Sequence, residues 1–230
     1  MKILAIVPAR MGSKRLPGKN IKVLSGKPLI QWSIESALEI DEISHVMVST
    51  DCPYIADIAL RSGAEVPFLR PKELATDSSS SFAVIKHALD YYKGQGEVFD
   101  YILLLQPTSP LRNKKHNEQA IALLRVKGAD AVVSVCKCEH SPLWSNTLPE
   151  DMSMEYFIRD TVKDSRSQEL PQSYRLNGAI YLSKVSRFYE EGTLFLSSNI
   201  YAYLMDNKSS VDIDHELDFL FAEMILKNVK

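Results

Sequence analysis

The length, composition and charge of this chain exclude several classes of protein. It has 230 residues, 45% hydrophobic and 24% charged, which is typical of a large globular domain. The net charge of −2 offers no global positive field for a nucleic acid or an anionic membrane, so we expect neither partner. No apolar segment is long enough to span a bilayer. The first apolar run is too short for a secretory signal. No second Cys/His cluster completes a zinc-like set with the three cysteines, so we interpret them as free thiols in a reducing cytosol and expect a cytoplasmic protein.

The chain opens with a strand that leads into a basic loop. Residues 3–7 form a continuous apolar run, typical of a strand buried on both faces of a parallel sheet. After Pro8 come Gly12, Gly18 and four cationic side chains. Open α/β sheets bind ligands at the carboxyl ends of their strands, and cations there suit a polyphosphate. The alternative is a solvated basic turn. Neither the Walker A spacing nor G-x-G-x-x-G is present, so this would be a different triphosphate loop.

Alternating helix and strand patterns follow, and they predict an α/β fold. The serines at 78–81 precede a helical pattern that they can cap, and their hydroxyls can face an anion. Two prolines stiffen the loop at 106–112, where polar side chains can be held in fixed directions. Helices are expected at residues 29–40, 53–62 and 114–127, and a further helix is expected to start at residue 82. Strands are expected at residues 45–50, 66–69, 101–106 and 131–136.

The regular pattern stops between residues 139 and 172. A long irregular segment inside a compact domain is either functional or part of an interface. We therefore interpret 139–172 as an arm inserted into a single domain of residues 1–230, and not as a linker. Strands are expected at 175–182 and 200–205. The last helix is expected to pack four apolar side chains inward: Leu217, Leu220, Phe221 and Met224.

Two acids alternate with apolar residues just before this last helix. On an extended segment Asp212 and Asp214 point the same way, while Val211 and Ile213 face the core. Two like charges on one face are unfavourable unless a cation joins them, and carboxylates with phosphates are typical Mg²⁺ ligands. The alternative is that Asp214 caps the helix at its positive end. The residues alone do not choose between these hypotheses.

Six motifs spread over nearly the whole chain resemble those of the acylneuraminate cytidylyltransferases (CMP-sialic acid synthetases), including CMP-legionaminic acid synthetase-like members. In chain order they are Pro8-Ala9-Arg10-x-Gly12-Ser13-Lys14-x-x-Pro17-x-Lys19-Asn20, Arg70-Pro71-x-x-Leu74-Ala75-x-Asp77, Gln106-Pro107-Thr108-Ser109-Pro110-Leu111-Arg112, Arg166-x-Gln168-x-Leu170-Pro171, Arg175-x-Asn177-Gly178-Ala179-Ile180-Tyr181 and Asp212-Ile213-Asp214. The resemblance implies a Rossmann-like mixed, mostly parallel sheet of the nucleotidyltransferase type, with a protruding dimerisation arm at 139–172.

The resemblance also implies roles for individual residues. The implied nucleotide-binding residues are Arg10, Gly12, Ser13, Lys14, Lys19, Asn20, Arg70, Ser79 and Ser81, of which Arg10, Lys14 and Lys19 are catalytic together with Asp214. The implied sugar-binding residues are Gln106, Thr108, Arg166, Arg175, Asn177, Tyr181, Leu194 and Phe195. Asp212 and Asp214 are the implied Mg²⁺ ligands, and the chain is expected to form a homodimer.

The implied reaction is the transfer of CMP from CTP to the anomeric hydroxyl of a nine-carbon nonulosonic acid, with release of pyrophosphate. One departure from the pattern concerns the sugar: Trp144 stands where typical sialic acid synthetases have lysine, so legionaminic and pseudaminic acids are also candidates. The alternatives are a nucleotidyltransferase for KDO or for a sugar 1-phosphate, and a non-catalytic nucleotide-binding module. That module would be expected to lack either the paired acids or the arginines.

Overall fold

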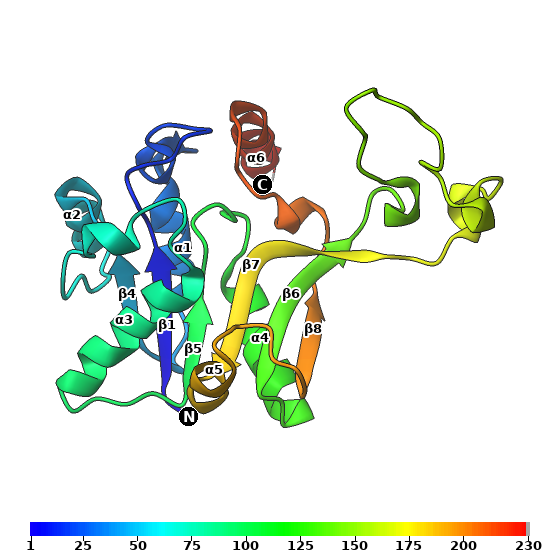
Figure 1. Cartoon of the computed structure of the whole chain (residues 1–230). Helices are drawn as coiled ribbons and strands as arrows, with labels where there is room; N and C mark the ends of the chain where they lie inside the picture. The colour runs from blue at the N-terminus through cyan, green and yellow to red at the C-terminus, as the bar shows by residue number, and fades with distance from the viewer. Residues whose placement is uncertain (229–230) are drawn as a thin grey trace.

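The computed structural model describes residues 1–228, which form a central sheet covered by helices on both faces (Figure 1). The strands are β1 (Ile3–Pro8), β2 (Val23–Leu24), β3 (Lys27–Pro28), β4 (Ile43–Ser49), β5 (Tyr101–Leu104), β6 (Ala131–Lys137), β7 (Tyr174–Lys184) and β8 (Ile200–Leu204). The α-helices are α1 (Leu29–Leu38), α2 (Pro53–Arg61), α3 (Ser81–Gly94), α4 (Lys114–Lys127), α5 (Val185–Glu191) and α6 (Glu216–Asn228). The 3-10 helices are η1 (Lys19–Ile21), η2 (Lys72–Leu74), η3 (Pro142–Trp144), η4 (Asp160–Val162), η5 (Ser167–Glu169) and η6 (Lys208–Ser210).

The main sheet is mixed and mostly parallel, which confirms the predicted fold class. Its strand order is β4-β1-β5-β7-β6-β8, and β2 and β3 form a separate hairpin. β1 pairs in parallel with β4 and β5, and β6 pairs in parallel with β8. Within residues 1–228, β7 alone runs antiparallel to its neighbours in this sheet. The carboxyl ends of the other strands therefore meet at one edge.

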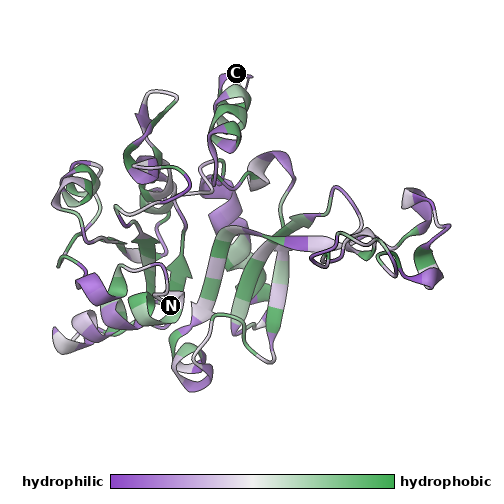
Figure 2. Cartoon of the chain, turned by 45° about the horizontal axis from the view of Figure 1, so that its top comes forward, coloured by the Kyte–Doolittle hydropathy of each residue, from purple (hydrophilic) through white to green (hydrophobic). Residues whose placement is uncertain are grey.

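Strand β1 is a continuous apolar run because both of its faces are buried. Ile3, Ala5 and Val7 pack against α1, α2 and α4 on one face of the sheet. Leu4 and Ile6 pack against α3 and α5 on the other face. Hydrophobic residues are accordingly concentrated in the strands (Figure 2). A strand buried on both faces has no solvent side on which polar residues could alternate.

Helix α6 packs through a different face from the one expected. Phe219, Ala222 and Ile225 are buried in a third core, which includes Leu16 of the first loop. The four side chains expected inward are instead largely exposed, with Leu217 at 76%; the others are Leu220, Phe221 and Met224. Apolar residues lie on nearly every side of α6, so the hydrophobic periodicity of its sequence does not predict which face is buried. The small side chain of Ala222 suits a close approach to the first loop.

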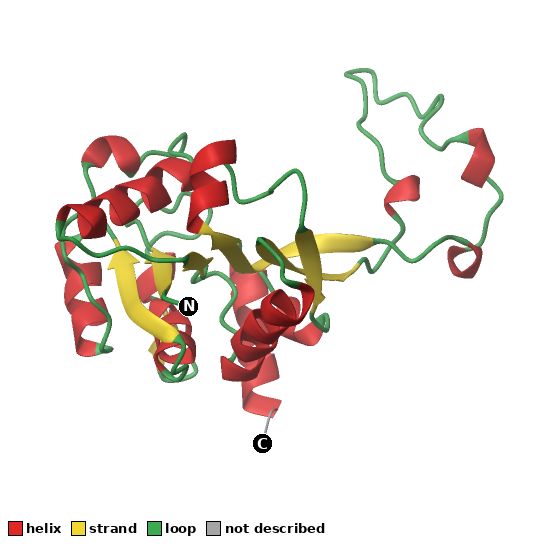
Figure 3. Cartoon of the chain, turned by 90° about the horizontal axis from the view of Figure 1, so that it is seen from below, coloured by secondary structure: helices red, strands yellow, loops and turns green. Residues whose placement is uncertain are grey.

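Two further segments differ from a regular α/β repeat. Residues 66–69, all described, form no strand: Thr50 makes a single bridge to Leu69, and Pro67 has no N–H to offer a ladder. Residues 139–172 extend from the ends of β6 and β7 away from the sheet, as irregular chain with three short 3-10 helices (Figures 1 and 3). No helix within residues 1–228 is long and apolar enough to cross a membrane.

Candidate active site

A cavity of about 540 Å³ opens beside the end of β1, at the edge where the parallel strands finish. The first loop, the proline-stiffened turn after β5 and the segment before α6 all contribute side chains to it. Its lining is Pro8, Arg10, Ser13, Lys14, Arg15, Lys19, Asn20, Asp77, Gln106, Pro107, Thr108 and Asp214. The structure therefore brings most of the predicted nucleotide-binding loop together with Gln106, Thr108 and Asp214. Gly12 lies in the loop but outside this lining.

Four cations in this cavity share two carboxylates. Asp77 is paired with Arg10 at 2.6 Å and also with Lys14. Hydrogen bonds from Lys14 and Arg10 hold the pKa of Asp77 below its ordinary value. Asp214 is paired with Arg15 and, at 3.2 Å, with Lys19. The excess of positive charge makes the cavity suitable for a polyanion.

The backbone of the first loop is shaped by residues that follow it. Gly18 adopts a left-handed conformation (φ 66°), which turns the chain into η1. Asn20 donates from its amide to the Arg10 carbonyl at 2.9 Å. Asn20 therefore fixes the loop in addition to lining the cavity.

A second, smaller hollow of about 180 Å³ adjoins the first and shares Pro8, Arg10 and Asp77 with it. Arg70, Ser79 and Ser81 line it, as the sequence predicted for one side of the nucleotide site. Ser80 caps α3 by accepting from the Ala83 N–H, which confirms the expected serine cap. Arg70 is buried, donates to the Leu74 carbonyl at 3.3 Å and has its pKa lowered by burial. It supports the wall of this hollow.

A third hollow, of about 290 Å³, lies on the other side of Gln106. Leu194 is buried, and Phe195 is 48% exposed and stacks edge-on against the Tyr181 ring, with centroids 5.8 Å apart. The lining is Ser80, Ser81, Phe82, Leu104, Gln106, Tyr181, Gly192, Thr193, Leu194 and Phe195. Four of the predicted sugar-binding residues are therefore neighbours here, and Gln106 belongs to both this hollow and the cationic cavity.

The Asp-Ile-Asp segment has the alternation that the sequence predicted. Val211 and Ile213 are buried, and the Ile213 N–H donates to the Thr108 carbonyl at 2.8 Å. The backbone N–H groups of Asp214 and His215 donate to Asp218. Asp218, and not Asp214, therefore satisfies the backbone before α6, and the Asp214 carboxylate remains available to the cavity.

Asp212 and Asp214 lie near enough for their charges to interact, although Asp214 lines the cationic cavity and Asp212 lines a separate recess with Glu139 and Arg175. Asp212 is exposed at the surface of a recess, where surrounding protein and the nearby Asp214 carboxylate raise its pKa. Gly178 (φ 74°) lies within β7 at this point: a Cβ there would be 3.2 Å from the Gln106 amide oxygen and 3.8 Å from Asp212. Within residues 1–228 no group of three His, Cys, Asp or Glu side chains is placed to form a metal cage. Two carboxylates with substrate phosphates fit the usual Mg²⁺ coordination.

Three predicted sugar-binding residues lie outside these hollows. Arg175 forms an ion pair with Glu139 at 3.0 Å in the recess beside Asp212. Asn177 is 1% exposed and joins β6 and β7 to η6 through bonds to Ser134 and Ser210. Arg166 is exposed in the arm. The role of each residue as a sugar ligand stays a prediction. To bind the sugar, Asn177 would have to break its hydrogen bonds to Ser134 and Ser210.

Two cavity residues were missed by the sequence reasoning. Asp77 ends the motif that begins at Arg70, and the resemblance implies no role for it; Arg15 is one of several cations in the first loop. The spacing of Asp77 just before the capping serines was a signal, because an acid there faces the first loop. Nothing in the sequence separates Arg15 from a solvated surface cation.

A cationic loop at the carboxyl end of the first strand, opposed by acids from neighbouring loops, forms a polyanion site where open α/β sheets bind their ligands, as a nucleotidyltransferase requires. The sequence model of one family, described as "Cytidylyltransferase", matches residues 4–207. The chain belongs to this cytidylyltransferase family, and it is a nucleotidyltransferase enzyme. The family and enzyme class predicted from the motifs are confirmed.

Similar proteins include three named cytidylyltransferases. A CMP-N,N'-diacetyllegionaminic acid synthase of Legionella pneumophila is 36% identical, covering 99% of this chain and 97% of that protein. An N-acylneuraminate cytidylyltransferase of Escherichia coli is 38% identical over 96% of this chain, which spans 51% of that longer protein. A pseudaminic acid cytidylyltransferase of Campylobacter jejuni is 34% identical, covering 99% of this chain and 97% of that protein.

Solved structures share the fold at lower identity. A CMP:2-keto-3-deoxy-manno-octonic acid synthetase complexed with CTP superposes with a TM-score of 0.71 at 20% identity, covering 99% of this chain and 100% of that chain. A 4-diphosphocytidyl-2C-methyl-D-erythritol synthase from Anaerococcus prevotii gives 0.66 at 15% identity, with 98% of each chain covered. At these identities the likeness shows the fold alone.

Proposed function

We propose that this enzyme transfers the CMP group of CTP to the anomeric hydroxyl of a nine-carbon nonulosonic acid and releases pyrophosphate. The main support for this proposal is the position of Gln106, which lines both the cationic cavity and the third hollow, where Leu194 and Phe195 also lie. In this proposal the triphosphate occupies the cationic cavity, and the N-acyl group of the sugar acid occupies the adjoining third hollow. The relatives named for legionaminic, N-acylneuraminic and pseudaminic acids support this substrate class.

The proposed reaction is an in-line displacement at the α-phosphorus of CTP. The anomeric oxygen forms the new bond to the α-phosphorus and gives its proton to solvent water, and the bond from the α-phosphorus to the bridging oxygen of pyrophosphate breaks. Negative charge builds on the leaving pyrophosphate, where Arg10, Lys14 and Lys19 would stabilise it. Phosphate oxygens would replace Asp77 as the partners of Arg10 and Lys14.

Asp212 and Asp214 would hold Mg²⁺ in this proposal. When bound, the ion supplies charge neutralisation on the phosphates and orients them. Lys19 keeps Asp214 at the cavity, because its ammonium nitrogen lies 3.2 Å from Asp214 Oδ1 and 2.5 Å from the Ile213 carbonyl.

The proposal includes a homodimer whose arms complete the partner's sites. The arm at 139–172 projects away from the sheet (Figure 3), and Arg166 lies outside the linings of the three hollows described above. An arginine with a planar fork suits the carboxylate of the sugar acid, which a second copy could present. A cytoplasmic location is part of the proposal, supported by Cys52, Cys136 and Cys138, which are free thiols.

A pyrophosphate-release assay tests the proposal against its alternatives. CTP is offered with legionaminic, N-acetylneuraminic and pseudaminic acids and with KDO, and each NTP is offered separately with sugar 1-phosphates. We expect release with CTP and at least one nine-carbon acid, and none with the Asp214→Asn variant. Release only with KDO or a sugar 1-phosphate would reassign the substrate. CTP binding without release in any mixture would identify a non-catalytic nucleotide-binding module.

A further inference from the structure

The loop at 192–199, between α5 and β8, forms one wall of the third hollow. Its residues Gly192 to Phe195 line that hollow. Two left-handed backbone conformations bracket the loop, at Gly192 (φ 67°) and Asn199 (φ 53°). The loop belongs to no helix or strand. Its position depends on the burial of Leu194 and Leu196 and on contacts made by side chains at its ends.

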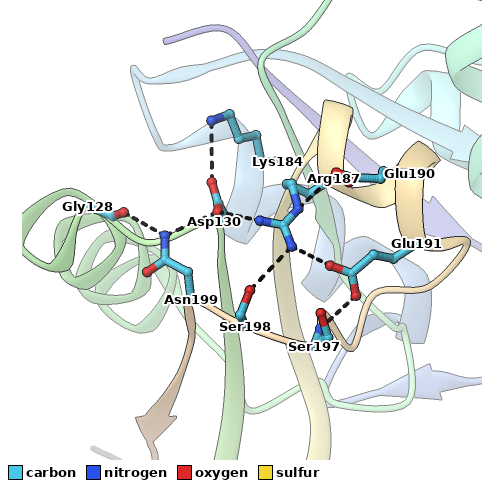
Figure 4. Close-up of polar contacts among 9 residues, drawn as sticks. All are labelled: Gly128, Asp130, Lys184, Arg187, Glu190, Glu191, Ser197, Ser198 and Asn199. Carbon is cyan, nitrogen blue, oxygen red and sulfur yellow. Dashed lines mark hydrogen bonds and ion pairs between the residues drawn. The ribbon is translucent and has the colours of Figure 1, made fainter.

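Arg187 on α5 connects both ends of this loop to the body of the protein (Figure 4). One guanidinium nitrogen, Nη1, donates to Asp130 at 3.1 Å, just before β6. The other, Nη2, donates to Glu191 and, at 3.4 Å, to the hydroxyl of Ser198. The third nitrogen, Nε, lies 3.2 Å from the carboxylate of Glu190.

Glu191 links the beginning of the loop to its end. One carboxylate oxygen accepts from Arg187, and the other accepts from the backbone N–H of Ser197 at 2.6 Å. The Ser197 N–H and the Arg187 guanidinium hold the pKa of Glu191 below its ordinary value. The ionised carboxylate therefore spans six positions of chain and draws Ser197 back towards α5.

Asp130 fixes the last residue of the loop. It accepts from the Asn199 amide at 3.2 Å, and the same amide donates to the Gly128 carbonyl at 3.0 Å. The Asp130 N–H donates to the Asn199 carbonyl at 2.9 Å. We call Asp130, Arg187, Glu191 and Asn199 the Arg187 cluster. Its members lie outside the linings of the three hollows described above.

We propose that Arg187 and Glu191 are positioning residues for sugar selectivity: they hold the 192–199 loop so that Leu194 and Phe195 form a fixed wall against the N-acyl group of the sugar. The inference rests on the proposed function. Binding walls select between similar substituents only when their supporting side chains hold them in place. The side chains of Arg187, Glu191 and Asp130 are 25%, 18% and 15% exposed, and they lie outside the three hydrophobic cores. Its removal should therefore loosen the loop without unfolding the protein.

The first test measures the loop without any substrate. Amide hydrogen exchange is compared in the wild type, Glu191→Ala and Arg187→Ala, with Lys184→Ala as the matched control, because Lys184 contacts Asp130 at 3.3 Å but not the loop. We expect peptides covering 192–199 to exchange roughly tenfold faster in the first two variants, as for a local opening. Peptides from β5, β6 and β8 should be unchanged, and Lys184→Ala should match the wild type.

The second test measures selectivity with two nonulosonic acids that differ only in their N-acyl group. In Glu191→Ala and Arg187→Ala we expect the KM of the preferred acid to rise roughly tenfold, the loss typical of one charge-assisted hydrogen bond. The ratio of kcat/KM between the two acids should move towards one, while the KM of CTP stays unchanged. Arg187→Lys should recover part of this ratio, because an ammonium can keep one of the contacts.

Each outcome decides between this inference and the function on which it rests. An unchanged exchange rate at 192–199 overturns the inference, and so does a loosened loop with unchanged acyl selectivity. A parallel rise in the KM of CTP, or a general loss of protection across the sheet, would show a structural role alone and also overturn it. If the wild-type enzyme uses no nonulosonic acid, the proposed function fails and the selectivity role falls with it, while the exchange rates still report whether the cluster holds the loop.

Discussion

Lys19 and Asp214 meet across the cavity, although 195 positions separate them in the chain. The Lys19 ammonium nitrogen lies 3.2 Å from Asp214 Oδ1 and 2.5 Å from the carbonyl of Ile213. The Lys19 side chain is mostly buried, at 10% exposure, so water screens this pair less than a surface pair. The first loop and the acidic segment are thereby held as one unit, with Asp214 directed at the cavity.

Replacing Asp214 with Asn should abolish turnover while the fold remains intact. The amide keeps the shape of the side chain but removes the negative charge proposed to hold Mg²⁺. Pyrophosphate release is measured over a range of Mg²⁺ concentrations, and circular dichroism checks the fold. Asp57→Asn is a matched control, since Asp57 pairs with Arg61 on α2. A rate near that of the wild type at saturating Mg²⁺ would reject the role of Asp214.

Replacing Asp77 with Asn should tighten CTP binding. Phosphate oxygens have to compete with Asp77 for Arg10 and Lys14. Without that carboxylate, the KM of CTP should fall roughly two- to fivefold, the range expected for an exposed ion pair. Lys14→Ala is the opposite variant, in which the KM of CTP should rise about tenfold because a charge-assisted contact is lost. A higher KM of CTP in Asp77→Asn would show that Asp77 organises the two cations for phosphate instead of competing with it.

Replacing Asp212 with Asn should raise the melting temperature and abolish turnover. The surroundings of Asp212 raise its pKa, so its ionised form is disfavoured in the folded protein. That destabilisation is complete above the raised pKa and disappears as the pH falls to the ordinary value of about 3.9. The gain in Tm of the Asn variant should therefore be full at neutral pH and shrink on acidification. An unchanged Tm at neutral pH would contradict this explanation.

The central strands were predictable because strands buried on both faces have continuous apolar sequences. The apolar runs that became β1, β5 and β6 lie where the sequence placed them. Helix α6 was predicted at the right place with the wrong face, because apolar residues surround it and the buried stripe is selected by the tertiary contact with Leu16. Similarly, Pro67 prevented a strand that the apolar pattern favoured.

The cavity was predictable in part, through motifs more than through physical pattern. The cations of the first loop and Gln106 converge as expected. The partners of those cations were not foreseen, since pairing with Asp77 depends on how the loop before α3 folds back on β1. Asn177 shows the converse: its amide is consumed by internal hydrogen bonds to Ser134 and Ser210, which only the packing of β6, β7 and η6 reveals.

Mixing two inactive variants tests whether Arg166 acts in the partner's site. Arg166 lies in the arm at 139–172, and Asp214 lies at the cavity of the main sheet. If the arm enters the partner's site, a heterodimer of an Arg166→Ala chain and an Asp214→Asn chain has one site with both groups and one site with neither. We therefore expect two nearly inactive parents to regain activity after subunit exchange, up to about a quarter of the wild-type rate, because half of the dimers are then mixed and each has one complete site.

Exchange is followed by native mass spectrometry with one parent carrying a mass tag, and pyrophosphate release is measured in the same mixture. A mixture of Asp57→Asn with Asp214→Asn shows the activity expected when one parent is intact. Size-exclusion chromatography with light scattering establishes that the parents are dimers, since a monomeric wild type would already exclude a shared site. If mixed dimers form and the activity stays at the level of the parents, Arg166 serves its own subunit, and the arm then contributes to dimer stability without completing the site.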